Sequence, residues 1–229
     1  MDIEKNLQFT NWLRKISLQF ISEKDFERLD KTSTKLKFKK GEVILKQGNQ
    51  PTHVAFLESG IVKFNFESES NKNTILTLVA APKILGGANL FYKDNNLFSI
   101  IAVEDCEVIL MDSNVLLSLL TTYGKFAVAV YQIASDMFKK SVFNFISLAN
   151  KQKEGRIADI IFYLADNIYH SNAFNLSLTR KELAEFACCS TENIIMTLSK
   201  WQAENIIKMT GKHLEITNIE KLKQISKIG

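Results

Sequence analysis

The stretch TRKELAEFACCSTENIIMTLSKW, residues 179–201, constrains the fold more than any other part of the chain. Thr179 is a favourable N-cap, and Glu182 three positions later completes a capping box for a helix over residues 180–186. Ser190 is a second N-cap and starts another helix directly after two adjacent cysteines. The pattern therefore predicts two short helices joined by a tight turn, which is the arrangement of a helix-turn-helix.

The second of these helices has two distinct faces. Ile194, Leu198 and Trp201 follow the spacing i, i+4, i+7 and predict one buried apolar stripe. The opposite face is small, polar or flexible rather than heavily charged, and it consists of Thr191, Glu192, Ile195, Met196 and Ser199. Such a compact face is typical of a recognition helix that enters the major groove of DNA, although a helical hairpin in any protein core has the same spacing.

A β-hairpin is predicted directly after the second helix. Ile206–Met209 and His213–Ile216 read as two short strands, and Gly211 lies in the turn between them. A hairpin in this position extends the unit to a winged helix-turn-helix. Lys212 and His213 at the hairpin tip are placed to reach a DNA phosphate.

The N-terminal half alternates short apolar segments with turn residues, which predicts a β-sandwich or β-roll. Residues 1–35 precede it and read as helical, first with an apolar face and then with a short helix that Ser22 caps. The apolar face consists of Phe9, Trp12, Leu13 and Ile16. Strands are expected over residues 36–38, 43–45, 54–57, 61–66, 74–79, 84–85, 99–103 and 107–111. In the fourth of these, Val62, Phe64 and Phe66 are expected to share one face.

One long helix without Gly or Pro is predicted over residues 126–148, after a short capped helix over residues 115–120. Its apolar positions are roughly heptad-spaced and are Val130, Ile133, Met137, Phe138, Val142 and Phe145. The pattern fits a dimer seam, and it fits equally a helix packed on the strands of its own chain.

The remaining segments complete a three-part organisation. Residues 150–153 read as a polar hinge, residues 155–169 as an amphipathic helix, residues 171–175 as a loop and residues 219–229 as a small helix. We therefore expect a sensor roll with its N-terminal helices over residues 1–120, the long helix and hinge over residues 121–150, and the winged helix-turn-helix over residues 151–229.

Composition bounds the classes of function. The net charge of +4 over 229 residues permits a nucleic-acid partner without demanding one. Three cysteines without paired spacing fit a reducing cytoplasm, and neither a signal peptide nor a membrane span is expected. The histidines, His53, His170 and His213, lie in three distant segments, so no catalytic or metal-ligating constellation is expected.

Taken in order, these elements resemble the cyclic-AMP receptor protein/FNR family (CRP/FNR) of bacterial transcription regulators. The resemblance covers nearly the whole chain from about Phe38. It rests on FKKGEVILKQGN (38–49), HVAFLESGIVKF (53–64), GRIADIIFYLA (155–165) and the stretch over residues 179–201. It implies an α+β fold: an N-terminal cyclic-nucleotide-binding-like β-roll (jelly-roll or cupin-like), a long dimerisation helix and a C-terminal winged helix-turn-helix.

The same resemblance implies partners. A homodimer would bind double-stranded DNA at a near-palindromic site, with its two recognition helices in successive major grooves about one helical turn apart. RNA polymerase is the further partner that a bacterial regulator of this family implies. The alternative that keeps the fold is a ligand-binding regulatory module that acts through protein contacts rather than DNA.

The chain departs from the family where nucleotide-binding members hold the cyclic phosphate with a Glu and an Arg. Those positions are Gly87 and Phe98 here, and only Ser99 remains polar. A buried phosphate would lack its charged partner, so tight cyclic-AMP binding is not expected. The effector is left open, and an apolar effector pocket would be lined by Leu85, Gly86, Gly87, Phe91, Phe98 and Ser99. No cofactor is expected, because three cysteines cannot supply a four-cysteine iron–sulfur cluster within one chain.

The recognition helix departs from the family as well. Members commonly present Arg, Glu and Arg, whereas here Glu192 matches the Glu and the flanking positions are Thr191 and Met196. Glu192 can accept a hydrogen bond from cytosine N4, and the apolar tip of Met196 can contact a thymine methyl. We therefore expect Glu192, Met196 and Ser199 to read bases. The residues expected to hold phosphates are Thr179, Arg180, Ser190, Thr191 and Lys212.

Overall fold

The computed structural model describes residues 14, 17–70, 72–86 and 94–228, so the predicted apolar face of Phe9, Trp12, Leu13 and Ile16 lies outside the described residues. The chain forms two compact units. The first contains residues up to 62 together with residues 79–138, and the second contains residues 63–78 together with residues 139–229. The domain boundaries expected from the sequence stay a prediction.

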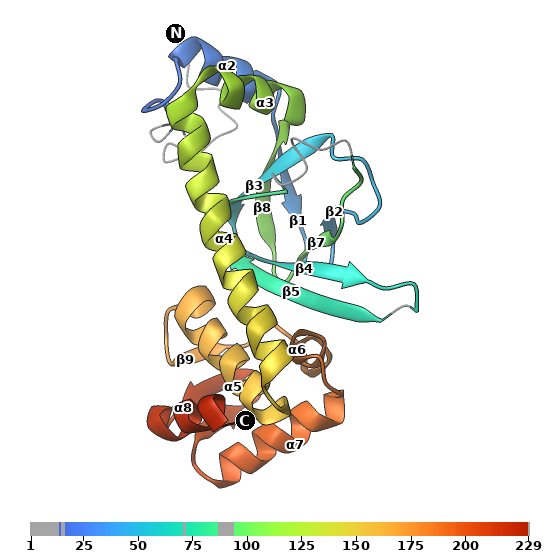
Figure 1. Cartoon of the computed structure of the whole chain (residues 1–229), viewed down its shortest axis with the longest axis vertical. Helices are drawn as coiled ribbons and strands as arrows, with labels where there is room; N and C mark the ends of the chain where they lie inside the picture. Colours follow the sequence, from blue (N-terminus) through green and yellow to red (C-terminus); the bar gives the residue numbers. More distant parts are fainter. Residues whose placement is uncertain (1–13, 15–16, 71, 87–93, 229) are drawn as a thin grey trace. The chain divides into compact units, whose positions relative to one another are not determined.

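The first unit is built from short strands between helices (Figure 1). In chain order its elements are α2 (Glu23–Lys31), β1 (Thr34–Phe38), β2 (Val43–Leu45), β3 (His53–Ser59), the start of β4 (Ile61–Glu67), the end of β5 (Asn73–Ala80), β6 (Lys83–Leu85), β7 (Ser99–Ala102), β8 (Cys106–Asp112) and α3 (Ser113–Thr122). The strands form one sheet in the order β1-β8-β3-β6 and another in the order β2-β7-β4-β5. The predicted β-roll is confirmed.

Helices α2 and α3 cover one face of the first sheet and close the core of this unit. Phe26 of α2, Phe56 of β3 and Leu116 of α3 are each at most 2% exposed within one apolar cluster. Both helices begin at capping residues: Ser22 Oγ, as predicted, accepts a hydrogen bond from Asp25 N, and Asp112 Oδ1 accepts one from Val115 N. Such caps satisfy backbone donors that the first turn of a helix leaves free.

The second unit gathers helices around a small sheet (Figure 1). It contains the C-terminal part of α4 (Gly124–Asn150), α5 (Lys153–Tyr163), the π-helix η2 (Leu164–Tyr169), β9 (Ala173–Asn175), α6 (Arg180–Ala187), α7 (Thr191–Ala203), β10 (Ile207–Thr210), β11 (His213–Ile216) and α8 (Ile219–Ile228). The small sheet has the order β10-β11-β9. The predicted long helix, helix-turn-helix and wing are confirmed.

Two local predictions in this unit are wrong. Residues 171–175 are not only a loop, because β9 pairs with β11 and sets Phe174 opposite Leu214. The helix predicted over residues 155–169 starts at Lys153 and changes to a π-helix at Leu164. Tyr169, at the end of η2, stacks on Phe174 of β9 with ring centroids 4.6 Å apart, so the π-helical turn and the new strand pack on each other.

Strand β4 differs from the expected pattern of one buried face. Lys63 and Asn65 alternate with Val62 and Phe64, and all four are buried. Lys63 is buried because its ammonium group meets the carboxylate of Glu182 at 2.8 Å within the second unit. Residues 63–78 are held there by further hydrogen bonds, from Tyr163 Oη to Leu78 O (2.6 Å) and from Asn144 Nδ2 to Leu76 O (3.0 Å).

No single helix among the described residues is long and apolar enough to span a membrane. Helices α3 and α4 reach the length and hydropathy of a membrane span only when they are taken together, and they are bent by 117° at their junction.

Candidate nucleic-acid interface

The two helices of the helix-turn-helix begin at the predicted caps. Thr179 Oγ1 accepts a hydrogen bond from Glu182 N, while Glu182 Oε2 accepts one from Thr179 N at 2.8 Å, which closes the capping box. Ser190 Oγ accepts a hydrogen bond from Asn193 N at 3.2 Å. Between them Cys188 has the left-handed conformation, with φ 49°, and ends α6. The turn is therefore set by backbone geometry and capping rather than by cysteine chemistry.

Helix α7 has the two predicted faces. Ile194, Leu198 and Trp201 are 1%, 4% and 0% exposed, so the stripe at i, i+4, i+7 packs inside the unit. On the opposite face Ile195 is 50% exposed and Met196 69%. We call the exposed residues Glu192, Ile195, Met196 and Ser199 the reading stripe. Their spacing of i, i+3, i+4, i+7 places them in one line along the helix.

Three cations on α5 and α7 are engaged by other partners. Lys200 Nζ lies 3.1 Å from Glu154 Oε1, and Lys153 Nζ donates to Asn193 Oδ1 at 3.2 Å. Arg156 NH1 donates to the carbonyl oxygen of Cys188 at 3.5 Å. The reading stripe thus carries one carboxylate, one hydroxyl and two apolar side chains.

Neighbouring hydrogen-bond donors favour the ionised form of Glu192. Hydrogen bonds from its own backbone N–H and from the Ser190 hydroxyl lower the pKa of the Glu192 carboxyl. Its position in the first turn of α7 favours a negative charge in addition. An ionised carboxylate only accepts hydrogen bonds, so the groups that it can meet in the major groove are the exocyclic amines of cytosine and adenine.

The predicted phosphate contacts fall into two groups. Thr179 and Ser190 are exposed at the N-termini of α6 and α7, Thr191 follows on α7, and Lys212 is exposed at the wing tip. Helix N-termini are suited to bind phosphate through their backbone N–H groups. At α6 the N–H and the hydroxyl of Thr179 both donate to Glu182, so a phosphate there would compete with that carboxylate. Arg180 differs, because it is half-buried, its guanidinium NH2 lies 3.4 Å from Met209 Sδ, and burial lowers its pKa. Its role at a phosphate stays a prediction that requires the side chain to turn outward.

A pocket of about 340 Å³ lies beside the turn between α6 and α7. Residues 72–74 form one wall, and Lys181, Cys188 and Thr191 contribute to the other. The sequence gives no signal of this pocket, since its walls are more than a hundred residues apart in the chain.

Lys151 of the predicted hinge belongs to a polar cluster centred on Asp159 of α5. Lys151 Nζ lies 2.7 Å from Asp159 Oδ2, which also accepts a hydrogen bond from Ser147 Oγ. Ser226 Oγ donates to Asp159 Oδ1. The carboxylate thereby joins the end of α4, the hinge, α5 and α8. Periodicity could not have found it, because each member looks like an ordinary surface residue in its own segment.

Helix α4 exposes an aromatic line. Tyr131, Phe138 and Phe145 follow each other at seven-residue intervals and are 72%, 71% and 69% exposed. Val142 is 37% exposed, whereas Val130, Ile133 and Met137 are half-buried, and Val130 packs on the core of the first unit. The sequence prediction thus combined residues of two faces and missed Tyr131. The seven-residue interval is the signal that could have found it.

The structure describes four of the six residues predicted for an effector pocket, and Gly87 and Phe91 lie outside the described residues. Leu85 and Ser99 are buried, and Ser99 Oγ accepts a hydrogen bond from Gln47 N at 2.9 Å. Gly86 has φ 81°, and Phe98 is half-buried. The described residues of this unit form an open pocket of about 390 Å³ at another place, between β1 and β2.

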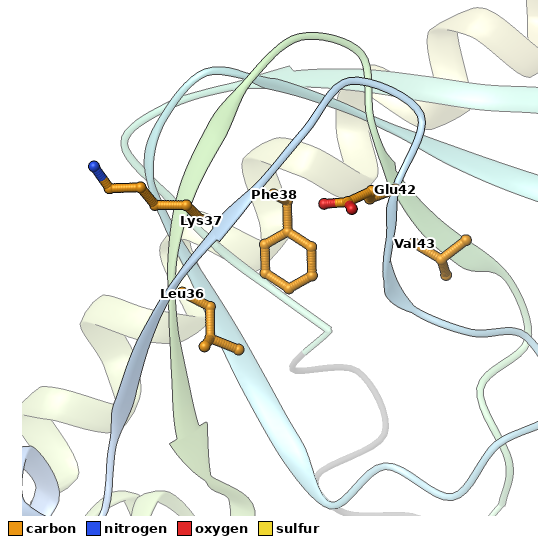
Figure 2. A pocket seen from close by; sticks show the side chains of 5 residues that line it. All are labelled: Leu36, Lys37, Phe38, Glu42 and Val43. Atoms are coloured by element: carbon orange, nitrogen blue, oxygen red, sulfur yellow. The ribbon is translucent and has the colours of Figure 1, made fainter.

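Figure 2 shows this open pocket: Leu36 and Phe38 of β1 project to the same side, Glu42 reaches toward the ring of Phe38, and Lys37 points away. Val43 completes the lining. The alternation of Leu36, Lys37 and Phe38, which predicted the strand, also accounts for the apolar wall.

Comparison with known protein families identifies both parts of the chain. Residues 35–123 match the cyclic nucleotide-binding domain, and residues 155–225 match the Crp-like helix-turn-helix domain. The protein belongs to the CRP/FNR family of transcription regulators. The family assigned from sequence motifs is confirmed, together with its α+β fold and its helix-turn-helix DNA-binding domain.

Individual CRP/FNR proteins are similar to this chain over most of its length. The fumarate and nitrate reduction regulatory protein of Yersinia pestis is 22% identical over 211 residues, which are 90% of this chain and 84% of that protein. The structure of FixK2 from Bradyrhizobium japonicum superposes with a TM-score of 0.76 at 14% identity, over 84% of this chain and 96% of FixK2. The structure of the c-di-GMP responsive regulator CLP of Xanthomonas campestris superposes with a TM-score of 0.72 at 20% identity, over 84% of this chain and 98% of CLP.

Proposed function

We propose that this CRP/FNR regulator is a homodimer that reads a near-palindromic duplex with the reading stripe of α7. The observation that carries the proposal is the stripe itself, which is exposed on a helix whose other face is buried and whose start is capped. A recognition helix needs a fixed backbone and a free outer face, and α7 has both.

Base reading and phosphate binding are assigned to different residues. Glu192, Met196 and Ser199 read base edges, and Thr179, Ser190, Thr191 and Lys212 fix the register on the backbone. Arg180 joins the second group once its guanidinium leaves Met209. Support for the division comes from the positions of the residues, since the first set lines α7 and the second lies at helix N-termini and the wing tip.

The dimer forms along α4. Tyr131, Phe138 and Phe145 supply a seam at heptad spacing, and Val142 adjoins it. Three large aromatic side chains that are each about two thirds exposed or more would be costly on a lone helix. Their burial against a second copy removes that cost and pairs the two recognition helices for two half-sites.

Cyclic AMP is not the proposed effector. Phe98 occupies the position of the phosphate-binding Arg, and an aromatic ring cannot neutralise a phosphate. Ser99 is already engaged by Gln47 N. The effector is left unassigned, and the proposed setting is the bacterial cytoplasm with RNA polymerase as a further partner.

Selection from a pool of random duplexes with purified protein tests the proposal. The expected result is a palindrome whose half-sites are about one helical turn apart. If neither purified protein nor protein with added small-molecule extract enriches any sequence, the alternative of a regulatory module that works through protein contacts takes its place.

A further inference from the structure

The reading stripe has an unusual composition at its centre. Ile195 and Met196 are 50% and 69% exposed, although Ile194, Leu198 and Trp201 already give α7 a complete buried face. The two apolar side chains therefore lie outside the buried face of α7. Glu192 and Ser199 flank them, and the seven-residue separation corresponds to about 10 Å along the helix, or roughly three base pairs.

The chemistry of the stripe selects among the groups of the major groove. Recognition of guanine depends mainly on Arg or Lys, which donate to O6 and N7. Lys200 on α7 and Lys153 and Arg156 on α5 each donate to a protein oxygen. The C5 methyl of thymine is the apolar group that a base pair presents in the major groove.

We infer that Ile195 and Met196 together form an apolar contact surface for C5 methyl groups in the major groove, so that the half-site is read at two neighbouring thymines. Ile195 is thereby a specificity-determining residue in addition to Met196. A cytosine that carries a C5 methyl presents the same apolar group, and the stripe accepts it at these positions. The inference rests on the proposed function, because it concerns the face that meets the bases.

The test uses the duplex obtained by selection, in which one functional group of one base is removed at a time. Each thymine is replaced in turn by deoxyuridine, which removes only the methyl, and each guanine by 7-deazaguanine, which removes the N7 acceptor. Binding is expected to weaken about fourfold for each contacted methyl, which corresponds to the burial of one such group. The 7-deazaguanine duplexes are expected to bind within about twofold of the parent.

Variants assign each methyl to its side chain. Ile195→Ala and Met196→Ala are each expected to remove the sensitivity to deoxyuridine at one position and to leave it at the other. Both residues are exposed, so the variants keep the fold, which circular dichroism checks. Gln224→Ala, an exposed change on α8, is the matched control and is expected to keep both sensitivities. A 5-methylcytosine at either position is expected to bind more tightly than cytosine.

The outcomes separate the two claims. A defined selected site whose affinity is the same with deoxyuridine at every thymine would overturn the inference and leave the proposed function standing. A loss of affinity that is seen only with the 7-deazaguanine duplexes would also overturn the inference and leave the proposed function standing. Failure to enrich any duplex, with or without extract, would overturn the proposed function and this inference with it.

Discussion

Lys63 Nζ lies 2.8 Å from Glu182 Oε1, and the two side chains are 11% and 17% exposed. Lys63 belongs to the segment that matches the cyclic nucleotide-binding domain, and Glu182 belongs to the segment that matches the helix-turn-helix domain. Both residues nevertheless lie in the same compact unit. The same carboxylate closes the capping box of α6, so one side chain links β4 to the start of the helix-turn-helix.

Replacing Glu182 with Gln is expected to destabilise the protein by about 2 kcal/mol, because Lys63 would keep its charge without a charged partner in a largely buried place. Urea unfolding at neutral pH measures the change. The double variant Lys63→Met with Glu182→Gln should recover part of the loss. Glu220→Gln, which removes an exposed ion pair with Lys223, is the control and should cost less than about 1 kcal/mol.

Acid is expected to weaken the same contact. Burial opposes ionisation of Glu182, but hydrogen bonds from Lys63 and Thr179 and the charge of Lys63 outweigh it, so the net effect lowers its pKa below the ordinary 4.5. A carboxyl with a lowered pKa stabilises the folded state above the unfolded pKa, and this contribution is lost as the pH falls through the folded value. Unfolding free energies from pH 6 downward should therefore fall less steeply in Glu182→Gln than in the parent; parallel curves would contradict the assignment.

Removal of the Glu192 carboxylate should change preference rather than folding. We expect Glu192→Ala to reduce discrimination for one C·G pair of the selected site by about tenfold, because the acceptor for cytosine N4 is lost. Overall affinity should rise, since a negative charge leaves the surface that faces phosphates. Competition between the selected duplex and one with that pair exchanged gives the ratio. Glu220→Ala, which makes the same change of charge on α8, is the control and should leave that affinity ratio unchanged.

A charge in the aromatic line of α4 should separate the subunits. Phe138→Glu places a carboxylate where two helices would meet, and it is expected to raise the dimer dissociation constant about 100-fold or more, or nearly 3 kcal/mol. Sedimentation at several concentrations measures the constant. Gln132→Glu adds the same charge at an exposed position off the heptad line, and it should leave the dimer intact. Equal sedimentation of parent and Phe138→Glu would argue against a seam on this line.

Among the glycines that the structure describes in the roll, Gly60 is expected to tolerate a side chain least. It has φ 95°, and a Cβ there would come within 2.6 Å of Cys106 Sγ and 2.7 Å of Asp105 O. Gly60→Ala should therefore cost about 3 kcal/mol or more, which combines a left-handed backbone with a steric overlap. Gly41→Ala is the matched control, since Gly41 has φ 90° and nothing within 4 Å, so it should cost only about 1 kcal/mol. Thermal unfolding of the two variants separates the contributions.

The sequence predicted what local chemistry decides. The starts of α6 and α7 could be predicted from Thr179, Glu182 and Ser190, because an N-cap acts on residues two or three positions away. On α4 the prediction included Phe138 and Phe145 of the exposed line, but it combined them with half-buried residues and missed Tyr131. These signals need no knowledge of distant parts of the chain.

The features that the sequence did not predict depend on long-range partners. Lys63 looked like a solvent-facing residue of an alternating strand, and only its contact with Glu182, more than a hundred positions later, explains its burial. Asp159 and Arg180 are similar, since their roles follow from Lys151 and from Met209. β9 was read as a loop because a three-residue strand has no periodicity of its own.

The reading stripe has a consequence for how the protein responds to its ionic surroundings. Counterions leave DNA when Lys or Arg side chains neutralise phosphates, and this release makes affinity depend on salt. The reading stripe contains no Lys or Arg, so its contacts with bases release no counterions from the DNA. Ionic strength would then set how much DNA the protein holds through Lys212 and the helix N-termini, while Glu192, Ile195, Met196 and Ser199 set which sequence is preferred at any salt concentration.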